Sequence, residues 1–275
     1  MASPYCPMPE TRTCAEAWLA AAEHLLEVGP TNTMILHIQE PQSYSATDDL
    51  IIAEVDAFLR KHGVYPVTTV ANTIFPQALY RPGDPARLYA RYKALFKRVK
   101  KLAPDWGRYF DRMIRWNSSD GTQLNQLCQL VTNLKKYGPL SEEKSTYYNI
   151  YELTLFHPEK DARKALNRQC LSFIEVKPEV DNQGRGVLHM TALYRSHYYV
   201  ARTLGNLIGL SRLLDFIAAE SGYTPGSLTI HSTHAELDTR GAEQSKGRKA
   251  WGKADVKELV STCRAFTREP APATP

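Results

Sequence analysis

A long helical pattern from about Val200 to Ser221 constrains the fold of this 275-residue chain most strongly. The pattern is apolar on more than one side, and such a helix is stable only when other elements surround it. Gly222 ends the pattern, and Pro225-Gly226 predicts a turn before a strand over 227–231. We therefore expect this helix at the centre of the fold.

The elements before this helix change in character along the chain. Four helical patterns and one strand-like stretch come first, at 15–28, 33–38, 45–62, 88–102 and 123–136. Stretches rich in β-branched and aromatic residues follow, at 145–153, 170–177 and 187–194. A hairpin loop is expected at Asp181–Gly184, between the last two. Helices followed by strands, without regular βαβ alternation, predict an α+β fold with helices packed on one mixed or antiparallel sheet.

The composition is that of a globular protein, with 43% apolar and 23% charged residues. We expect a single domain over 14–266 and disordered segments at 1–13 and 267–275, which are rich in proline and small residues. No apolar run is long enough for a membrane, and the first residues lack a secretory signal pattern, so we expect a cytoplasmic protein. The net charge of +5 is mild, and nucleic acid is not an expected partner.

Cysteine spacing and motif absences exclude several classes of protein. The five cysteines are scattered and include no CxxC, so neither a zinc ribbon nor a redox pair is indicated, and we expect no metal. GxGxxG, P-loop, HExxH and GxSxG patterns are absent. This weighs against dinucleotide oxidoreductases, P-loop kinases, zinc proteases and common serine hydrolases.

Two segments carry residues suited to chemistry. In the first, Cys170 opens an apolar strand directly after a polar, basic tripeptide. In the second, Arg195 and Ser196 end a strand, and Asn206 follows at the start of the central helix. Each residue alone has an ordinary structural reading, such as packing, a surface ion pair or a helix cap. Their joint occurrence in this order favours a functional site.

These segments resemble the thymidylate synthase superfamily, which includes the pyrimidine hydroxymethylases. The similarity covers roughly the last half of the chain and is carried by QCLSFIEV, LYRSHYY, GNLIGLSRLLDFI and TPGSLTIHSTHAELD. The resemblance implies a thymidylate synthase-like fold and a homodimer. It also implies one-carbon transfer from 5,10-methylenetetrahydrofolate to C5 of a pyrimidine nucleoside 5′-monophosphate.

The resemblance assigns roles to individual residues. Cys170 would add to C6 of the base, which makes C5 nucleophilic. A reactive thiolate needs nearby positive charge, for which Arg195 and Arg168 are candidates. Arg195 and Ser196 would hold the phosphate, since a guanidinium binds phosphate in a bidentate way. Asn206 would recognise the edge of the base, because a carboxamide both donates and accepts.

Other positions depart from the family. Lys144 is the only cation in the segment where the family carries a pair of phosphate-binding arginines. The family's sugar-binding HxY motif aligns on Glu236 and Asp238, while His234 lies close by in the sequence. These departures leave open both the base, uracil or cytosine, and the sugar, ribose or deoxyribose.

The expected reaction type depends on a segment that the sequence lacks. The family's N-terminal segment that shields the reduction step is not recognisable, and water must enter for hydroxymethylation but not for methylation. We therefore favour hydroxymethylation of CMP, dCMP or dUMP. The alternatives are a thymidylate synthase making dTMP from dUMP, a non-catalytic relative that binds nucleotide or RNA, and, more remotely, a cysteine hydrolase pairing Cys170 with His197 or His231.

Overall fold

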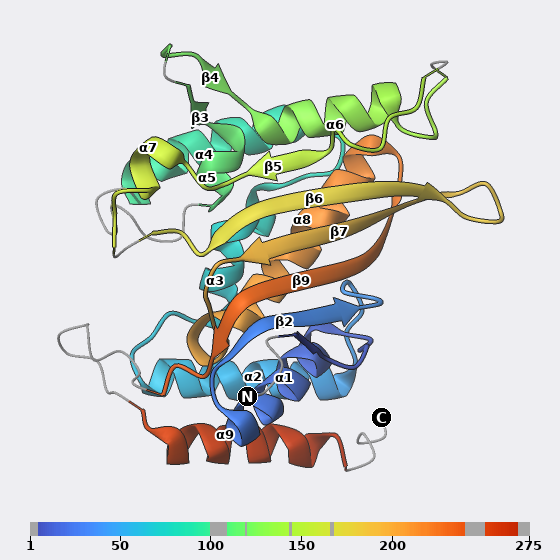
Figure 1. Cartoon of the computed structure of the whole chain (residues 1–275). Helices are drawn as coiled ribbons and strands as arrows, with labels where there is room; N and C mark the ends of the chain where they lie inside the picture. The colour runs from blue at the N-terminus through green and yellow to red at the C-terminus, as the bar shows by residue number, and fades with distance from the viewer. Residues whose placement is uncertain are drawn as a thin grey trace. The chain divides into compact units, whose positions relative to one another are not determined.

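The computed structural model describes residues 5–99, 109–118, 120–142, 145–165, 168–239 and 251–268 (Figure 1). The chain divides into two compact units. Unit 1 takes 1–71, 194–208 and 229–275, and unit 2 takes 72–193 and 209–228. Because both the central helix and the last strand contribute residues to both units, we describe each unit by itself.

Unit 1 combines helices with a partly parallel set of strands. Its helices are α1 (Cys14–Val28), α2 (Ala46–Lys61), most of α3 (Val67–Ile74), the first turn of α8 (Leu204–Ser221) and α9 (Lys253–Phe266). Its strands are β1 (Cys6–Pro7), β2 (Thr31–Ile38), β8 (His197–Tyr198) and most of β9 (Thr224–Glu236). The strand order is β1-β2-β9, and both the β1–β2 and the β8–β9 pairs are parallel.

Two capping boxes start the first helices of unit 1. Thr13 and Glu16 cap α1, while Ser45 and Asp48 cap α2. Such reciprocal caps satisfy backbone amides that the helix itself leaves without partners. The Thr13 hydroxyl also donates to the Asp48 carboxylate at 2.7 Å in a buried contact. This bond ties the starts of the two helices together.

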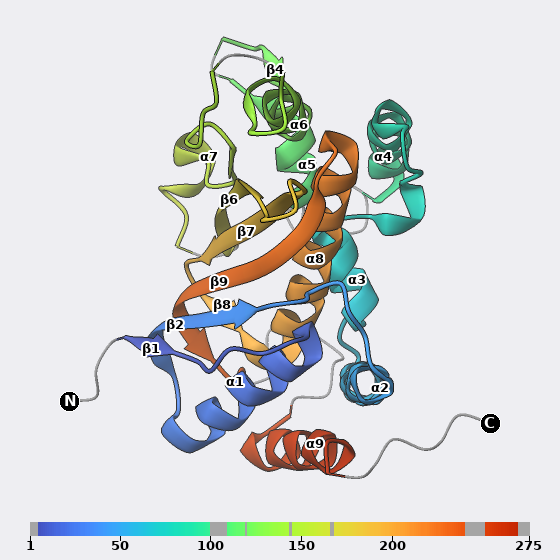
Figure 2. The ribbon, with the colours of Figure 1, turned by 90° about the vertical axis from the view of Figure 1, so that its right-hand side faces the viewer.

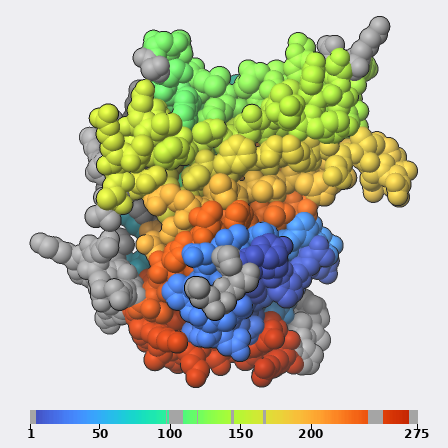
Figure 3. All heavy atoms as spheres, in the orientation of Figure 1, coloured from blue at the N-terminus to red at the C-terminus, as the bar shows by residue number. Residues whose placement is uncertain are grey.

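Unit 2 is built on antiparallel strands. Its helices are α4 (Pro85–Val99), α5 (Tyr109–Ile114), α6 (Gln126–Tyr137), α7 (Pro158–Asp161) and the rest of α8, with a 3-10 turn at Gln77–Leu79. Its strands follow the order β9-β7-β6-β5, with β5 at Glu152–Thr154, β6 at Leu171–Val180 and β7 at Gly186–Tyr194. A separate hairpin joins β3 (Trp116–Asn117) to β4 (Gln123–Leu124). On the face shown in Figure 3, the segments coloured green to yellow lie next to one another.

The α+β class is confirmed, since helices accompany a mixed sheet with parallel and antiparallel pairs. The central helix is also confirmed. Its apolar residues are almost completely buried, and in unit 2 it runs along one face of β6 and β7 (Figure 2). It begins at Leu204 rather than Val200, because Tyr199–Thr203 form a wider π-helical turn.

Three local expectations differ from the structure. The turn at Pro225-Gly226 is wrong, because both residues lie inside β9. A Cβ on Gly226 would lie 2.8 Å from the His189 ring and from the Val187 side chain, so glycine there allows close packing on β7. The strand over 145–153 shrinks to β5, and the helix over 88–102 becomes α4. The hairpin loop at Asp181–Gly184 is confirmed by a 2.9 Å bond from the Asp181 amide to the Arg185 carbonyl.

The structure describes part of the first segment that the sequence predicts to be disordered. Within 1–13, the described residues include β1, and Thr13 caps α1, because this segment finds partners on β2 and at the helix start. Most of the tail, 269–275, lies outside the described residues. The expectation of one domain over 14–266 stays a prediction. Among the described residues, no helix is both long and apolar enough to cross a membrane.

Candidate active site

Cys170 lies directly before β6 in unit 2 and is half-buried. The start of the strand beside it is held from two sides. The Leu171 amide donates to the hydroxyl of Tyr109 on α5 at 3.4 Å, and the Ser172 carbonyl accepts from the Leu155 amide at 2.9 Å. The backbone at Cys170 is therefore anchored, and the residue as a whole is half-buried.

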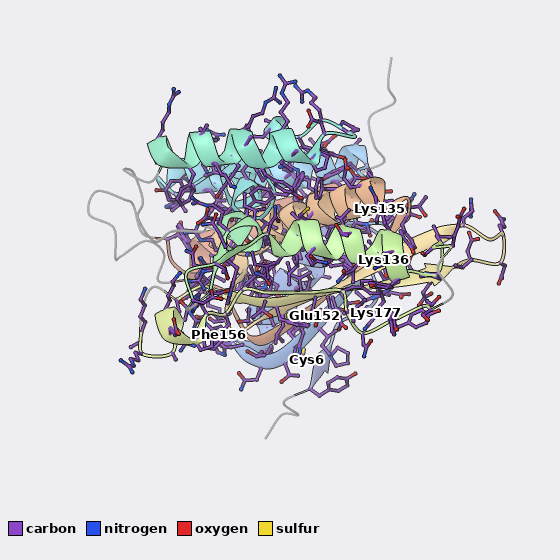
Figure 4. All side chains as sticks on the ribbon, turned by 90° about the horizontal axis from the view of Figure 1, so that it is seen from above. Cys6, Lys135, Lys136, Glu152, Phe156 and Lys177 are labelled. Atoms are coloured by element: carbon purple, nitrogen blue, oxygen red, sulfur yellow. The ribbon has the colours of Figure 1, made fainter. Side chains whose placement is uncertain are left out.

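Arg168 lies two residues before Cys170 and is the predicted cation of this segment whose position the structure describes. It is half-buried, and its guanidinium carbon lies 5.6 Å from the centre of the Phe156 ring, a cation–π contact. Phe156 lies just before α7 (Figure 4). The contact places the Arg168 guanidinium over the Phe156 ring. Lys144, the other predicted cation of unit 2, lies outside the described residues.

Arg195 and Ser196 form the turn between β7 and β8 in unit 1, and both are half-buried. The Arg195 carbonyl accepts a 2.8 Å hydrogen bond from the hydroxyl of Thr233 on β9. Directly after the turn, His197 pairs with Ala235 of β9 in parallel register. The turn backbone is therefore fixed to β9 on both sides of Ser196.

Asn206 is the third residue of α8, and only 4% of it is exposed. The preceding residue explains how the helix can begin there. A Cβ on Gly205 would lie 2.6 Å from Cβ of Val70 and 2.7 Å from the Val67 carbonyl oxygen. Glycine thus lets the first turn of α8 lie against α3, and this contact places the Asn206 side chain.

The Asn206 amide belongs to a buried hydrogen-bonded cluster in unit 1. Asn206 Nδ2 lies 3.0 Å from Nε2 of His197, and Nδ1 of His197 lies 3.0 Å from Oγ of Ser232. The Tyr199 hydroxyl lies 3.2 Å from the same Ser232 oxygen. Tyr194 stacks on the His197 ring, with ring centres 3.9 Å apart and planes 3° from parallel. Of these five, the sequence predicts Asn206 for base recognition and His197 only as a remote hydrolase candidate; the structure adds Ser232, Tyr199 and Tyr194.

Burial decides the charge of this cluster. Burial lowers the pKa of His197 to about 3, so its ring is neutral at physiological pH. Both of its ring nitrogens are already engaged, by Asn206 and Ser232. This arrangement counts against a hydrolase in which His197 would activate Cys170. His231, the other histidine of that reading, has a buried Nε2 without a hydrogen-bond partner.

The predicted sugar-binding residues lie at the end of β9. His234 Nδ1 lies 3.0 Å from Oδ1 of Asn32 on β2, and Glu236 is half-buried opposite Tyr198 of β8. Asp238 aligns with the tyrosine of the HxY motif. In this structure it instead holds the backbone where the π-helical turn begins. Its carboxylate accepts from the Val200 amide at 2.8 Å, and burial raises its pKa to about 6.

The predicted residues thus fall into two groups. Arg195, Ser196 and the Asn206 cluster belong to unit 1, as do His234 and Glu236. Cys170 and Arg168 belong to unit 2.

Curated archaeal proteins are similar to part of this chain. A relative from Methanococcoides burtonii is 40% identical over 50 residues, 18% of this chain and 23% of that protein. One from Methanothermobacter thermautotrophicus is 44% identical over 52 residues, and one from Methanothermobacter marburgensis is 35% identical over 68 residues. Each carries the name "Putative thymidylate synthase". The resemblance to the thymidylate synthase superfamily is confirmed.

The thymidylate synthase-like similarity is local. The matched stretch covers 19% of this chain and 23% of the M. thermautotrophicus relative, and 25% of this chain and 28% of the M. marburgensis relative. The chain therefore spans about a quarter of the length of these curated relatives. No family model matches the chain.

No residue of the described part is assigned to the one-carbon donor that thymidylate synthases imply. Two surface hollows of the described part are lined by other residues. One lies between α1 and α9, and the other lies at the end of α6, beside Lys135 and Lys136 (Figure 4). Neither hollow includes Cys170, Arg195 or Asn206. Among the described residues, no group of three or more metal-ligating side chains is present either.

Proposed function

We propose that this protein is an enzyme that adds a one-carbon group to C5 of a pyrimidine nucleoside 5′-monophosphate. Two facts support the proposal: the similarity to thymidylate synthases, and the placement of Asn206. The second carries it. A buried carboxamide held by a neutral histidine, in the same unit as a half-buried Arg195-Ser196 turn, suits recognition of a base whose phosphate is also bound.

Binding comes first in the proposed mechanism. The Arg195 guanidinium offers two parallel N–H donors to phosphate oxygens, and the Ser196 hydroxyl adds a third. Asn206 forms hydrogen bonds with the edge of the base. Arg168 supplies positive charge that favours the thiolate form of Cys170. The phosphate and the edge of the base are thereby both bound by residues of unit 1.

Covalent activation follows. The Cys170 thiolate forms a bond to C6, and the electron pair of the C5–C6 double bond moves to C5 and the conjugated C4 substituent. C5 is then nucleophilic and bonds to the incoming carbon. Loss of the C5 proton and release of the donor's amine leave an exocyclic methylene on C5. Addition of a nucleophile to that carbon and departure of the thiolate from C6 then restore the double bond and the free enzyme. By resemblance, methylenetetrahydrofolate supplies a carbon at the oxidation level of formaldehyde.

Two outcomes are open to the new exocyclic carbon. We favour hydroxymethylation, in which water adds to that carbon, because the segment that shields the family's reduction step is not recognisable in the sequence. The names of the archaeal relatives favour the second candidate, methylation of dUMP to dTMP. In that reaction a hydride replaces water, and the donor becomes dihydrofolate.

Product analysis separates these candidates. The protein is incubated with UMP, dUMP, CMP or dCMP and methylenetetrahydrofolate, and the nucleotide is weighed by mass spectrometry. A product heavier by CH2O together with tetrahydrofolate means hydroxymethylation. A product heavier by CH2 together with dihydrofolate means methylation. Unchanged nucleotide in all four reactions contradicts the proposed enzyme.

The remaining candidate is a non-catalytic relative that binds nucleotide or RNA. Helix α4 favours it, since Arg87, Lys93 and Arg98 are exposed there. This candidate predicts nucleotide or RNA binding that Cys170→Ala leaves unchanged, without any product. We also propose, by resemblance, that the enzyme is a homodimer, which light scattering on the purified protein tests. The cytosol as its compartment stays a prediction.

A further inference from the structure

The cluster around Asn206 has a feature that the proposed reaction does not require. The orientation of the Asn206 amide is coupled to the tautomer of His197. Its Nδ2 group can only donate, so Nε2 of His197, 3.0 Å away, must accept. A neutral imidazole carries one proton, which therefore lies on Nδ1 and is donated to Oγ of Ser232 at 3.0 Å.

The surroundings keep the imidazole neutral and hold the ring in place. His197 is 1% exposed and Ser232 is fully buried, so water does not compete for the ring nitrogens. Burial keeps the imidazole neutral, with its pKa lowered to about 3. The Tyr194 ring lies parallel to the imidazole at 3.9 Å between centres, which opposes rotation of the ring out of its plane. Tyr199 contacts Ser232 from the other side, with its hydroxyl 3.2 Å from Oγ.

A fixed amide distinguishes the two pyrimidines. Uracil presents an acceptor at O4 and a donor at N3, whereas cytosine presents a donor at N4 and an acceptor at N3. Rotating the Asn206 amide by half a turn exchanges its own donor and acceptor and so exchanges the preferred base. With the imidazole proton on Nδ1, the rotated amide would place its oxygen against the accepting Nε2 of His197, which is unfavourable.

We propose that His197 is the positioning residue for base choice: it holds the Asn206 amide in one orientation, so that the protein accepts uracil or cytosine but not both. The inference rests on the proposed function, because it concerns the same nucleotide. It adds a residue that never touches the substrate. Its effect therefore falls on the ratio of affinities for the two bases, not on phosphate binding.

Calorimetric titration tests the inference without any donor. Wild-type protein, His197→Phe and the control His37→Phe are titrated with UMP, CMP, dUMP and dCMP. The control histidine lies in the same unit, bonded through Nδ1 to the Thr229 hydroxyl at 2.9 Å. We expect the wild type to prefer one base by at least about tenfold, since a mismatched edge leaves polar atoms without partners.

The variants then separate specificity from folding. In His197→Phe the ring nitrogens are lost while the planar ring remains, so the base preference should fall below about threefold. His37→Phe should keep the wild-type ratio. His197→Gln retains an accepting oxygen and should restore part of the preference. An unchanged ratio in folded His197→Phe overturns the inference.

Two further outcomes are also decisive. If His197→Phe does not fold, Ser232→Ala replaces it, because loss of Oγ frees Nδ1 and lets the proton move to Nε2. A reduced base ratio in that variant supports the inference, and an unchanged one overturns it. A wild type that binds both bases equally also overturns it. A wild type that binds none of the four nucleotides contradicts the proposed function instead.

Discussion

The surroundings of Asn206 and of Cys170 differ in almost every physical respect. Asn206 is 4% exposed, and its amide is bonded to a neutral histidine whose other nitrogen is also engaged. Cys170 is half-buried at the start of a strand, with its neighbours anchored through their backbones. A group that recognises a base must not move, whereas a nucleophile must be reachable. The two regions meet these opposite requirements.

The largest effect on turnover should come from substitution of Cys170. Cys170→Ser should lower turnover by roughly 10⁴-fold or more, because removing a nucleophile removes the covalent route altogether. Nucleotide affinity should change little. The matched control is Cys128→Ser, an exposed cysteine on α6 in the same unit, which should keep full activity. Steady-state kinetics with the active nucleotide checks both variants, and comparable losses in the two would remove the special role of Cys170.

The anchoring of unit 2 depends on an ion pair between Arg112 of α5 and Asp161 of α7. The pair is bidentate, and the carboxylate also accepts from the His157 amide at 2.9 Å. Asp161→Asn should lower the free energy of unfolding by about 3 kcal/mol, because the charge of Arg112 loses its buried partner. Urea denaturation measures the change, with the exposed Glu159→Gln on α7 as control. Equal stability of the two variants would show that this pair does not hold the unit.

The same ion pair gives a pH dependence with a definite sign. Burial alone would raise the pKa of Asp161, but the hydrogen bonds from Arg112 and from the His157 amide hold it below the ordinary 3.8. A lowered pKa stabilises the folded state above the unfolded value, and this stability is lost as the pH falls through the folded value. Acid should therefore weaken the wild type more than Asp161→Asn.

Substitutions of Arg195 test the predicted phosphate-binding role of this residue. Arg195→Ala should weaken nucleotide affinity by about 10- to 100-fold, since a charge-assisted hydrogen bond contributes roughly 1.5–3 kcal/mol. Arg195→Lys should recover part of the loss, because a lysine donates without the planar fork. Arg185→Ala, in the exposed hairpin loop, is the control. Titration with the preferred nucleotide measures all three, and wild-type affinity in Arg195→Ala would exclude it from the phosphate site.

The smallest expected effect is a change in the pH dependence of stability at Asp238, which follows Asn206 in the chain. Burial raises its pKa from 3.8 to about 6. A raised pKa means stability that is fully present below the unfolded value and is lost as the pH rises through about 6. Asp238→Asn should remove this loss between about pH 4 and about pH 7, while the exposed Asp49→Asn should keep it. Urea midpoints over that range measure the slope, and identical slopes in all three proteins would contradict the assignment.

The sequence predicts the elements whose patterns are long and unambiguous. The buried helix α8 follows from its apolar residues, and Cys170 at the mouth of β6 follows from the apolar run after it. Gly226 misleads, because a proline-glycine pair usually marks a turn, yet here the missing side chain serves packing against His189. The role of His197 could not be predicted, since it lies nine positions before Asn206 and the π-helical turn Tyr199–Thr203 comes between them. Only the fold shows that contact.

Exchange of the C5 hydrogen tests the central claim most directly. Addition of Cys170 to C6 makes C5 basic, so a tritium label at C5 of the bound nucleotide should pass to water even without a one-carbon donor. We predict Cys170-dependent tritium release that Cys128→Ser retains and Cys170→Ser abolishes. Release that persists in Cys170→Ser, or no release with any labelled pyrimidine monophosphate that binds, would contradict the account.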